Sequence, residues 1–142
     1  MQSLVLDTNV VLDAFVFADE NARPLLPALA EGRFTWLATA AMRDELERVL
    51  GYARIVPRLA AGGVDAAHVL AAFDRFASIV DVPAKAPSTC SDPDDQKFID
   101  LAVDRSALLL SRDGAVLSMR NRLARLGATV RAALEPLPAR IA

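Results

Sequence analysis

The chain has 142 residues, of which 54% are hydrophobic and 24% charged, and its formal net charge is −2. This length and hydrophobic content suit a sizeable core, so we expect residues 1–142 to form a single domain. The slight negative charge excludes a protein that holds nucleic acid mainly through a basic surface, and any such binding must be local or assisted by a metal ion.

Membrane insertion and secretion are not expected from this sequence. No apolar run reaches the length needed to cross a bilayer, and Asp7 interrupts the first apolar run too early for a secretory signal. Cys90 is the only cysteine, so the chain cannot form an internal disulfide. These features are typical of a cytoplasmic protein.

The first half of the chain alternates short apolar strands with helices. We predict strands over residues 3–6 and 34–37, and helices over residues 10–18, 24–31 and 39–50. Thr8 or Asn9 is expected to be the N-cap of the first helix, because both side chains can accept a backbone hydrogen bond. Gly32 and Gly51 are expected to end the second and third helices.

The second half continues the same alternation. We predict two helices that flank Gly62 and Gly63, a strand over residues 79–82, a surface connection over 83–91, a helix over 94–104, a strand over 108–110, a last helix that reaches residue 126 and an edge strand over 128–131. Short apolar strands that alternate with helices predict an α/β fold with a parallel sheet covered by helices.

Two acidic residues follow predicted strands. Asp7 comes directly after the strand over residues 3–6, and Asp113 follows the strand over 108–110 after two residues. Because ligands of open parallel sheets bind at the carboxyl ends of the strands, we expect both at one edge of the sheet. Each also has a structural explanation, Asp7 as a helix cap and Asp113 as a turn residue.

Glu45 lies in a helix with several acidic residues, but its position there is distinctive. At about 3.6 residues per turn, it flanks the apolar stripe that contains Met42 and Val49, whereas Asp44 points further away. A carboxylate beside a buried stripe needs a partner or a metal ion. Pairing with Arg48 is the structural alternative.

Asp95 belongs to an acidic segment at the start of a predicted helix. Asp92 can be the N-cap of that helix, Pro93 its first residue and Asp95 the acidic residue of a capping box, which is a common arrangement. However, Asp95 also shares a helix face with Phe98 and Ile99, so it is expected to lean toward the sheet.

Four carboxylates from distant parts of the chain are therefore expected to meet: Asp7, Glu45, Asp95 and Asp113. Such a group is unfavourable without a cation, and hard divalent ions accept oxygen ligands of this kind. The chemistry that follows is phosphodiester hydrolysis, in which one ion generates a hydroxide and a second stabilises the leaving oxygen. His68 is the sole histidine, expected near the surface, which weakens serine or cysteine nucleophile schemes.

The chain resembles the PIN-domain nucleases in four motifs that occur in the order found in that family. They are Leu4-Val5-Leu6-Asp7-Thr8-Asn9-Val10, Asp44-Glu45-Leu46, Asp92-Pro93-Asp94-Asp95-Gln96-Lys97-Phe98 and Leu110-Ser111-Arg112-Asp113. Among these nucleases it most resembles the toxin components of bacterial toxin-antitoxin modules, the VapC-type toxins.

The resemblance implies a three-layer α/β/α fold with a central parallel sheet and a single-strand-specific endoribonuclease activity. It implies that the four acids bind Mg²⁺ or Mn²⁺, and that Thr8, Asn9 and Ser111 are supporting polar residues. It also implies a homodimer and a small antitoxin protein that blocks the site. Arg112, beside Asp113, is a candidate contact to the phosphates of the RNA.

One departure from the family pattern concerns the second metal ion. Many relatives carry another acid two residues after the position of Asp113, where this chain has Ala115. Asp92 or Asp94 is a candidate replacement. Ala115 also supports an alternative function, a catalytically weak or inactive PIN-like domain that binds RNA or a protein partner.

A phosphatase of the haloacid-dehalogenase type also places an aspartate after its first strand. That class requires a second aspartate two residues later, where this chain has Asn9. We therefore expect no hydrolysis of phosphomonoesters.

Overall fold

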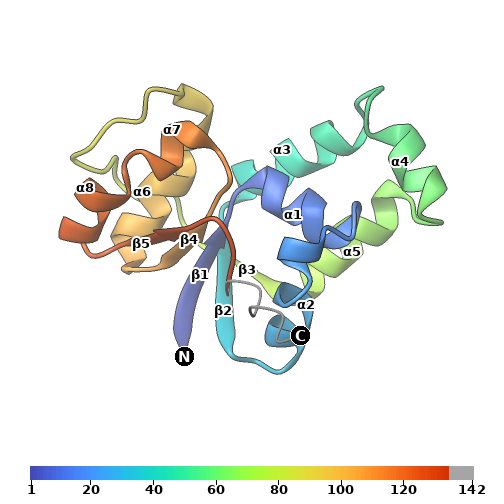
Figure 1. Cartoon of the computed structure of the whole chain (residues 1–142), viewed down its shortest axis with the longest axis horizontal. Coiled ribbons are helices and arrows are strands. Elements are labelled where there is room, and N and C mark those ends of the chain that lie inside the picture. The colour runs from blue at the N-terminus through green and yellow to red at the C-terminus, as the bar shows by residue number, and fades with distance from the viewer. Residues whose placement is uncertain (135–142) are drawn as a thin grey trace, which may run out of the picture.

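A parallel sheet organises the computed structural model, which describes residues 1–134 (Figure 1). Within those residues the sheet has five strands in the order β3-β2-β1-β4-β5, and every neighbouring pair is parallel. The strands are β1 (Gln2–Leu6), β2 (Phe34–Ala38), β3 (Ala77–Ile79), β4 (Leu108–Leu110) and β5 (Thr129–Arg131). The predicted α/β class is confirmed.

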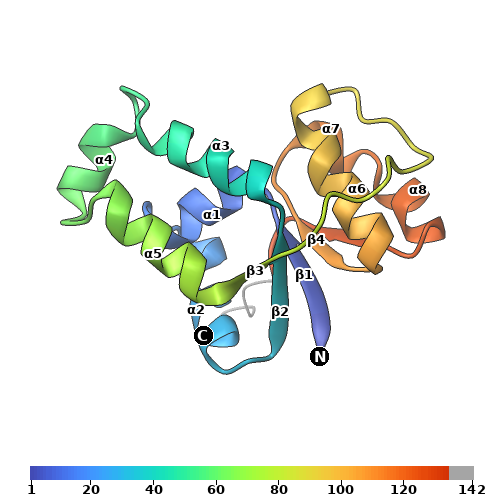
Figure 2. The ribbon, with the colours of Figure 1, turned by 180° about the vertical axis from the view of Figure 1, so that it is seen from behind.

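Helices lie on both sides of this sheet. They are α1 (Thr8–Phe15), α2 (Leu25–Ala30), α3 (Ala40–Leu50), α4 (Val56–Ala61), α5 (Ala66–Phe76), α6 (Gln96–Arg105), α7 (Gly114–Leu117) and α8 (Arg120–Arg125), with single 3₁₀ turns at η1 (Glu20–Ala22) and η2 (Pro93–Asp95). Figures 1 and 2 show α1 to α5 on one side and α6 to α8 on the other, which is the expected α/β/α layering. No helix of the described part is long and apolar enough to cross a bilayer.

The central strands are apolar and buried toward their carboxyl ends, where both faces of the sheet are covered. Leu4, Val5 and Leu109 are completely buried. On the α1 to α5 side, the buried Trp36 ring stacks on Phe15 at a centroid distance of 6.1 Å and meets Phe73 edge-on at 4.9 Å. This aromatic contact joins β2 to α1 and α5.

The strand order places a topological switch point between β1 and β4. From β1 the chain winds outward through β2 to β3, then returns to the other side of β1 to form β4 and β5. Leu6 pairs with Leu110 in register, and the Asp7 backbone N–H donates to the Leu110 carbonyl at 3.2 Å. The residues that follow β1 and β4 are therefore neighbours, at the position where open parallel sheets bind ligands.

The first and last helices differ from the prediction. Asp7 is the N-cap of α1 in place of Thr8 or Asn9, and α1 ends at Phe15 because the apolar residues that follow it pack against the core outside the helix. The last predicted helix is divided into α7 and α8. The sequence does not mark this break because Val116, Met119 and Leu123 are all buried and keep their helical spacing across it.

The third strand is also displaced from its predicted position. β3 begins at Ala77, two residues earlier than expected, because its register is set by pairing with β2, where Ala77 lies opposite Trp36. The apolar run that suggested a later strand ends in exposed side chains, including Val82. Val82 lies beyond the end of β3, where the chain has left the sheet.

Gln96 and Asp100 of α6 anchor the connection over residues 83–91. The Gln96 side chain accepts from the Cys90 N–H at 2.7 Å and donates to the Ser88 carbonyl and to Asp100. Asp100 also accepts from the Ala86 N–H at 2.8 Å. These bonds fix the approach to η2, and they explain why Cys90 is buried in a segment without regular secondary structure.

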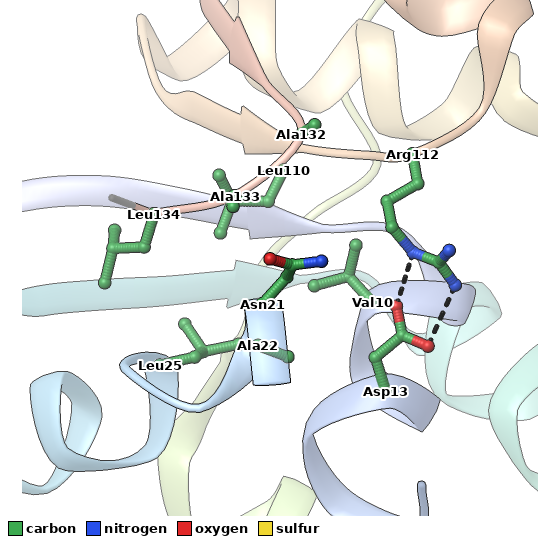
Figure 3. Close-up of a pocket in the computed structure, with 10 residues that line it drawn as sticks. All are labelled: Val10, Asp13, Asn21, Ala22, Leu25, Leu110, Arg112, Ala132, Ala133 and Leu134. Carbon is green, nitrogen blue, oxygen red and sulfur yellow. Dashed lines mark hydrogen bonds and ion pairs between the residues drawn. The ribbon is translucent and has the colours of Figure 1, made fainter. Parts of the chain in front are cut away.

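An ion pair joins α1 to the loop that follows β4. The Arg112 guanidinium donates to both oxygens of Asp13, at 2.6 Å and 2.9 Å (Figure 3). The Asp13 side chain is 5% exposed and that of Arg112 is 49% exposed. Burial raises the pKa of Asp13, and the Arg112 hydrogen bond opposes that effect. Arg112 therefore compensates a buried carboxylate, and it holds the loop that carries Ser111 and Asp113.

Replacing Arg112 with alanine is expected to lower the free energy of unfolding by about 1–3 kcal/mol, because Asp13 would keep its burial and lose its partner. Urea denaturation at pH 7 measures this change. Arg105→Ala is the matched control, since Arg105 pairs with Asp104 at the surface and exposed pairs contribute less than about 1 kcal/mol. Equal losses in the two variants would contradict the assigned role.

Candidate metal centre

Four acidic side chains line one cavity of about 270 Å³ at the carboxyl edge of the sheet: Asp7, Glu45, Asp95 and Asp113. Asp7 follows β1, and Glu45 lies in α3, which begins just after β2. Asp95 ends η2, at the start of the helix that leads into β4, and Asp113 follows β4. The structure thus brings together acids that are up to 106 positions apart in the chain, as the strand order requires.

Asp7 and Asp113 are both helix caps and cavity residues. The Asp7 carboxylate accepts from the Val10 N–H at 2.9 Å, and that of Asp113 accepts from the Ala115 N–H at 2.8 Å. Ser111, which is fully buried, accepts from the Asp113 N–H at 3.1 Å and hydrogen bonds to Asp7, an interaction that favours the ionised form of Asp7. The structural and functional explanations of these acids are therefore compatible.

Asp92 completes a compact group with Asp95 and Asp113. One carboxylate oxygen from each of the three residues lies within 4.8 Å of the others. Asp92 was expected as a helix cap, and it does cap η2 by accepting from the Asp94 N–H at 3.0 Å. It was not among the four predicted ligands, although the absence of an acid at Ala115 had pointed to it as a replacement.

Two carboxyl groups of this site, those of Asp95 and Asp7, have raised pKa values. The pKa of Asp95 is raised to about 7, mainly by burial. A hydrogen bond with Asp113 and repulsion from Asp113, Asp92 and Asp7 contribute further. Burial also raises the pKa of Asp7, against the hydrogen bonds from Ser111 and Val10. One buried oxygen of Asp95 has no hydrogen-bond partner among the described residues. An all-carboxylate donor set with an unpartnered oxygen fits a hard divalent cation.

Glu45 stands apart from this group because both of its oxygens are occupied. One accepts a hydrogen bond from the Thr8 hydroxyl, and the other accepts from the Lys97 ammonium at 2.8 Å. Lys97 also donates to the Asp94 carbonyl at 2.6 Å. The partner of Glu45 is therefore Lys97 and not Arg48, and this ion pair ties α3 to the start of α6.

The other predicted site residues divide between this cavity and the rest of the molecule. Thr8 and Asn9 line the cavity beside the acids. Arg112 lies outside it, held by Asp13 at a separate cavity of about 10 Å³ (Figure 3). Arg48, which flanks Glu45 in the sequence, does line the acidic cavity. The position of Arg112 was not predictable from its neighbour Asp113, because consecutive side chains in an extended loop point in different directions.

Stability of the metal-free protein is expected to fall as the pH rises from 5 to 8. Between its ordinary pKa near 3.8 and its folded pKa of about 7, Asp95 binds its proton more tightly in the folded protein than in the unfolded one. The expected loss is on the order of 1 kcal/mol, since water reaches part of the carboxyl group and screens it.

Urea denaturation in the presence of a chelator measures this dependence. Asp95→Asn is expected to remove most of the fall, while the exposed Asp104→Asn keeps it. A stability that increases over this pH range in the chelated native protein would contradict the assignment.

Comparison with known proteins agrees with this geometry. The family model of the PIN domain matches residues 3–115, a segment that contains Asp7, Glu45, Asp92, Asp95 and Asp113. None of the curated proteins compared with the chain matches it. PIN domains are generally metal-dependent nucleases, and the all-parallel sheet with order β3-β2-β1-β4-β5 is typical of them. The chain therefore belongs to the PIN-domain family.

Proposed function

We propose that this protein is a metal-dependent endoribonuclease that hydrolyses phosphodiester bonds of single-stranded RNA and acts as the toxin of a toxin-antitoxin pair. The observation that carries the nuclease activity is the group formed by Asp92, Asp95 and Asp113, in which a buried Asp95 oxygen has no partner among residues 1–134. Family membership supports a nucleic acid as the substrate.

Asp92, Asp95 and Asp113 are the residues proposed to hold Mg²⁺ or Mn²⁺, with Asp7 as a further carboxylate in the same cavity. A bound divalent ion supplies a hydroxide nucleophile at neutral pH and neutralises charge on the phosphate. The ligands must be deprotonated for this, so Asp95 has to release the proton that its raised pKa retains in the metal-free protein.

The polar residues around the acids fix their orientation. Ser111 contacts both Asp7 and Asp113, and Thr8 and Lys97 hold Glu45 from two sides. Such bonds keep the carboxylates in place before substrate binds, which is the main contribution that a protein makes to a site of this kind. Asn9, which lines the same cavity, is proposed to contact the substrate or its bound water.

Carboxylates are the groups available for proton transfer in this cavity. His68, the only histidine of the chain, is exposed on α5 and does not line it. The two oxygens of Glu45 already accept hydrogen bonds, so Glu45 is proposed to position Thr8 and Lys97 beside the acids.

Three parts of this proposal rest on the resemblance to VapC-type toxins. They are the single-stranded RNA substrate, the antitoxin partner and the homodimer. A single domain over residues 1–142 and a cytoplasmic location belong to the same proposal. A second candidate function, a PIN-like domain that binds RNA or a protein without cutting, is favoured by Ala115. We consider it the weaker one, because Asp92 supplies a third carboxylate near Asp95 and Asp113.

Incubation of the purified protein with an unstructured RNA in Mg²⁺ or Mn²⁺ is expected to give internal cleavage, and a chelator should abolish it. Asp95→Asn should lower the cleavage rate at least about 100-fold, since the loss of one oriented ligand commonly costs this much. Gel electrophoresis of end-labelled RNA measures the rate.

Asp104→Asn is the control, because Asp104 lies on α6, the helix that follows Asp95, and pairs with Arg105 at the surface. It should cleave at the native rate, and phosphomonoesters should remain intact in all samples. Cleavage by native and Asp95→Asn proteins at equal rates would indicate a contaminating nuclease, and cleavage by neither would favour the binding function.

A further inference from the structure

Two arginines and a tyrosine form one wall of the acidic cavity. Arg48 lies in the last turns of α3, and Tyr52 and Arg54 lie in the turn that follows. All three are exposed, with 38% of the Tyr52 surface accessible to solvent, and all three line the cavity that contains the acids. We refer to these residues as the arginine-tyrosine wall.

The side chains of the wall contact one another. The Arg54 guanidinium lies 5.4 Å from the centroid of the Tyr52 ring. Arg48 hydrogen bonds to Tyr52, and this interaction is the main cause of a raised pKa of Arg48. Tyr52 therefore contacts both cations, while part of its surface stays accessible to solvent.

The charge of the wall arginines is not used by an ion pair with any described residue, although both line a cavity that contains acids. Within residues 1–134, neither Arg48 nor Arg54 lies within ion-pair distance of an acidic side chain. By contrast, Arg43 of the same helix holds Asp74 at 2.7 Å, and Arg112 holds Asp13. Arg48 and Arg54 thus remain available to bind an anion.

Proteins commonly bind single-stranded nucleic acid with an exposed aromatic ring that has arginines beside it. Bases stack on the ring, and the arginines contact phosphates on either side. A chain with a formal net charge of −2 must bind RNA through local positive charge or a metal ion, and this wall provides local positive charge beside the acids.

We propose that the arginine-tyrosine wall is the surface that holds the RNA strand next to the scissile phosphate, with a base stacked on Tyr52 and neighbouring phosphates bound by Arg48 and Arg54. This inference rests on the proposed function, because it takes the acids to be the place of cleavage. It also predicts a preference for single strands, since the bases of a duplex are stacked on each other and cannot reach Tyr52.

The test measures RNA binding separately from cleavage. A fluorescently labelled, unstructured RNA of about ten nucleotides is titrated with the full chain carrying Asp95→Asn, which prevents cutting, and anisotropy gives the dissociation constant. Adding Tyr52→Ala is expected to weaken binding about tenfold, whereas Tyr52→Phe should keep it within about twofold. Tyr52→Leu replaces Tyr52→Ala if the alanine variant does not fold, because leucine keeps apolar bulk without a ring.

Charge and strand controls complete the experiment. Arg54→Ala should weaken binding several-fold and reduce the slope of log affinity against log salt by about 1. Arg122→Ala should change neither quantity, because Arg122 is also exposed but lies on α8 and does not line the cavity. A duplex of the same sequence should bind Tyr52→Ala and its parent equally.

Equal affinity of the single strand for the parent, Tyr52→Ala and Arg54→Ala would overturn the inference, even if the native protein cleaves RNA. A wall that contacts a protein partner instead would give this result. Conversely, loss of affinity in these variants together with no cleavage by the native protein would support the wall and overturn the proposed catalysis.

Discussion

The site depends on one constraint: the fold brings several carboxyl groups close together, partly removed from water, at the switch point of the sheet. The fold places Asp7 and Asp113 at adjoining strand ends, and η2 adds Asp92 and Asp95. The sheet and its helices hold these groups together, partly removed from water, so burial first and then repulsion from the neighbouring acids raise the pKa of Asp95 to about 7. A divalent cation relieves this repulsion, and its binding is therefore coupled to the stability of the fold.

The same residues serve the fold and the site. Asp7, Asp92 and Asp113 each accept a backbone hydrogen bond at the start of a helical segment, which fixes their side chains at the cavity. Part of the electrostatic cost is offset within the chain, since Lys97 holds Glu45 and thereby joins α3 to α6. Three of the cavity's acids are thus held at the starts of helical segments, which are more rigid than loop tips.

Sequence reasoning was most successful where local patterns determine the structure. Apolar runs located the strands, and the acids directly after them were expected at one edge, because parallel strands end together. It failed where long-range contacts decide. The partner of Glu45 is Lys97, 52 positions away, and Arg112 turns to Asp13, 99 positions away. Local spacing contains no information on such pairs, and it gave Asp92 only as a helix cap and a candidate replacement.

A crystal structure of the protein grown with Mn²⁺ tests the central claim most directly, because the anomalous signal of manganese locates the ion without assumptions about activity. The account predicts an ion bonded to carboxylate oxygens of Asp92, Asp95 and Asp113, inside the cavity that Asp7 and Glu45 also line. A cavity without an ion at saturating Mn²⁺, or an ion bound only elsewhere on the surface, would contradict it.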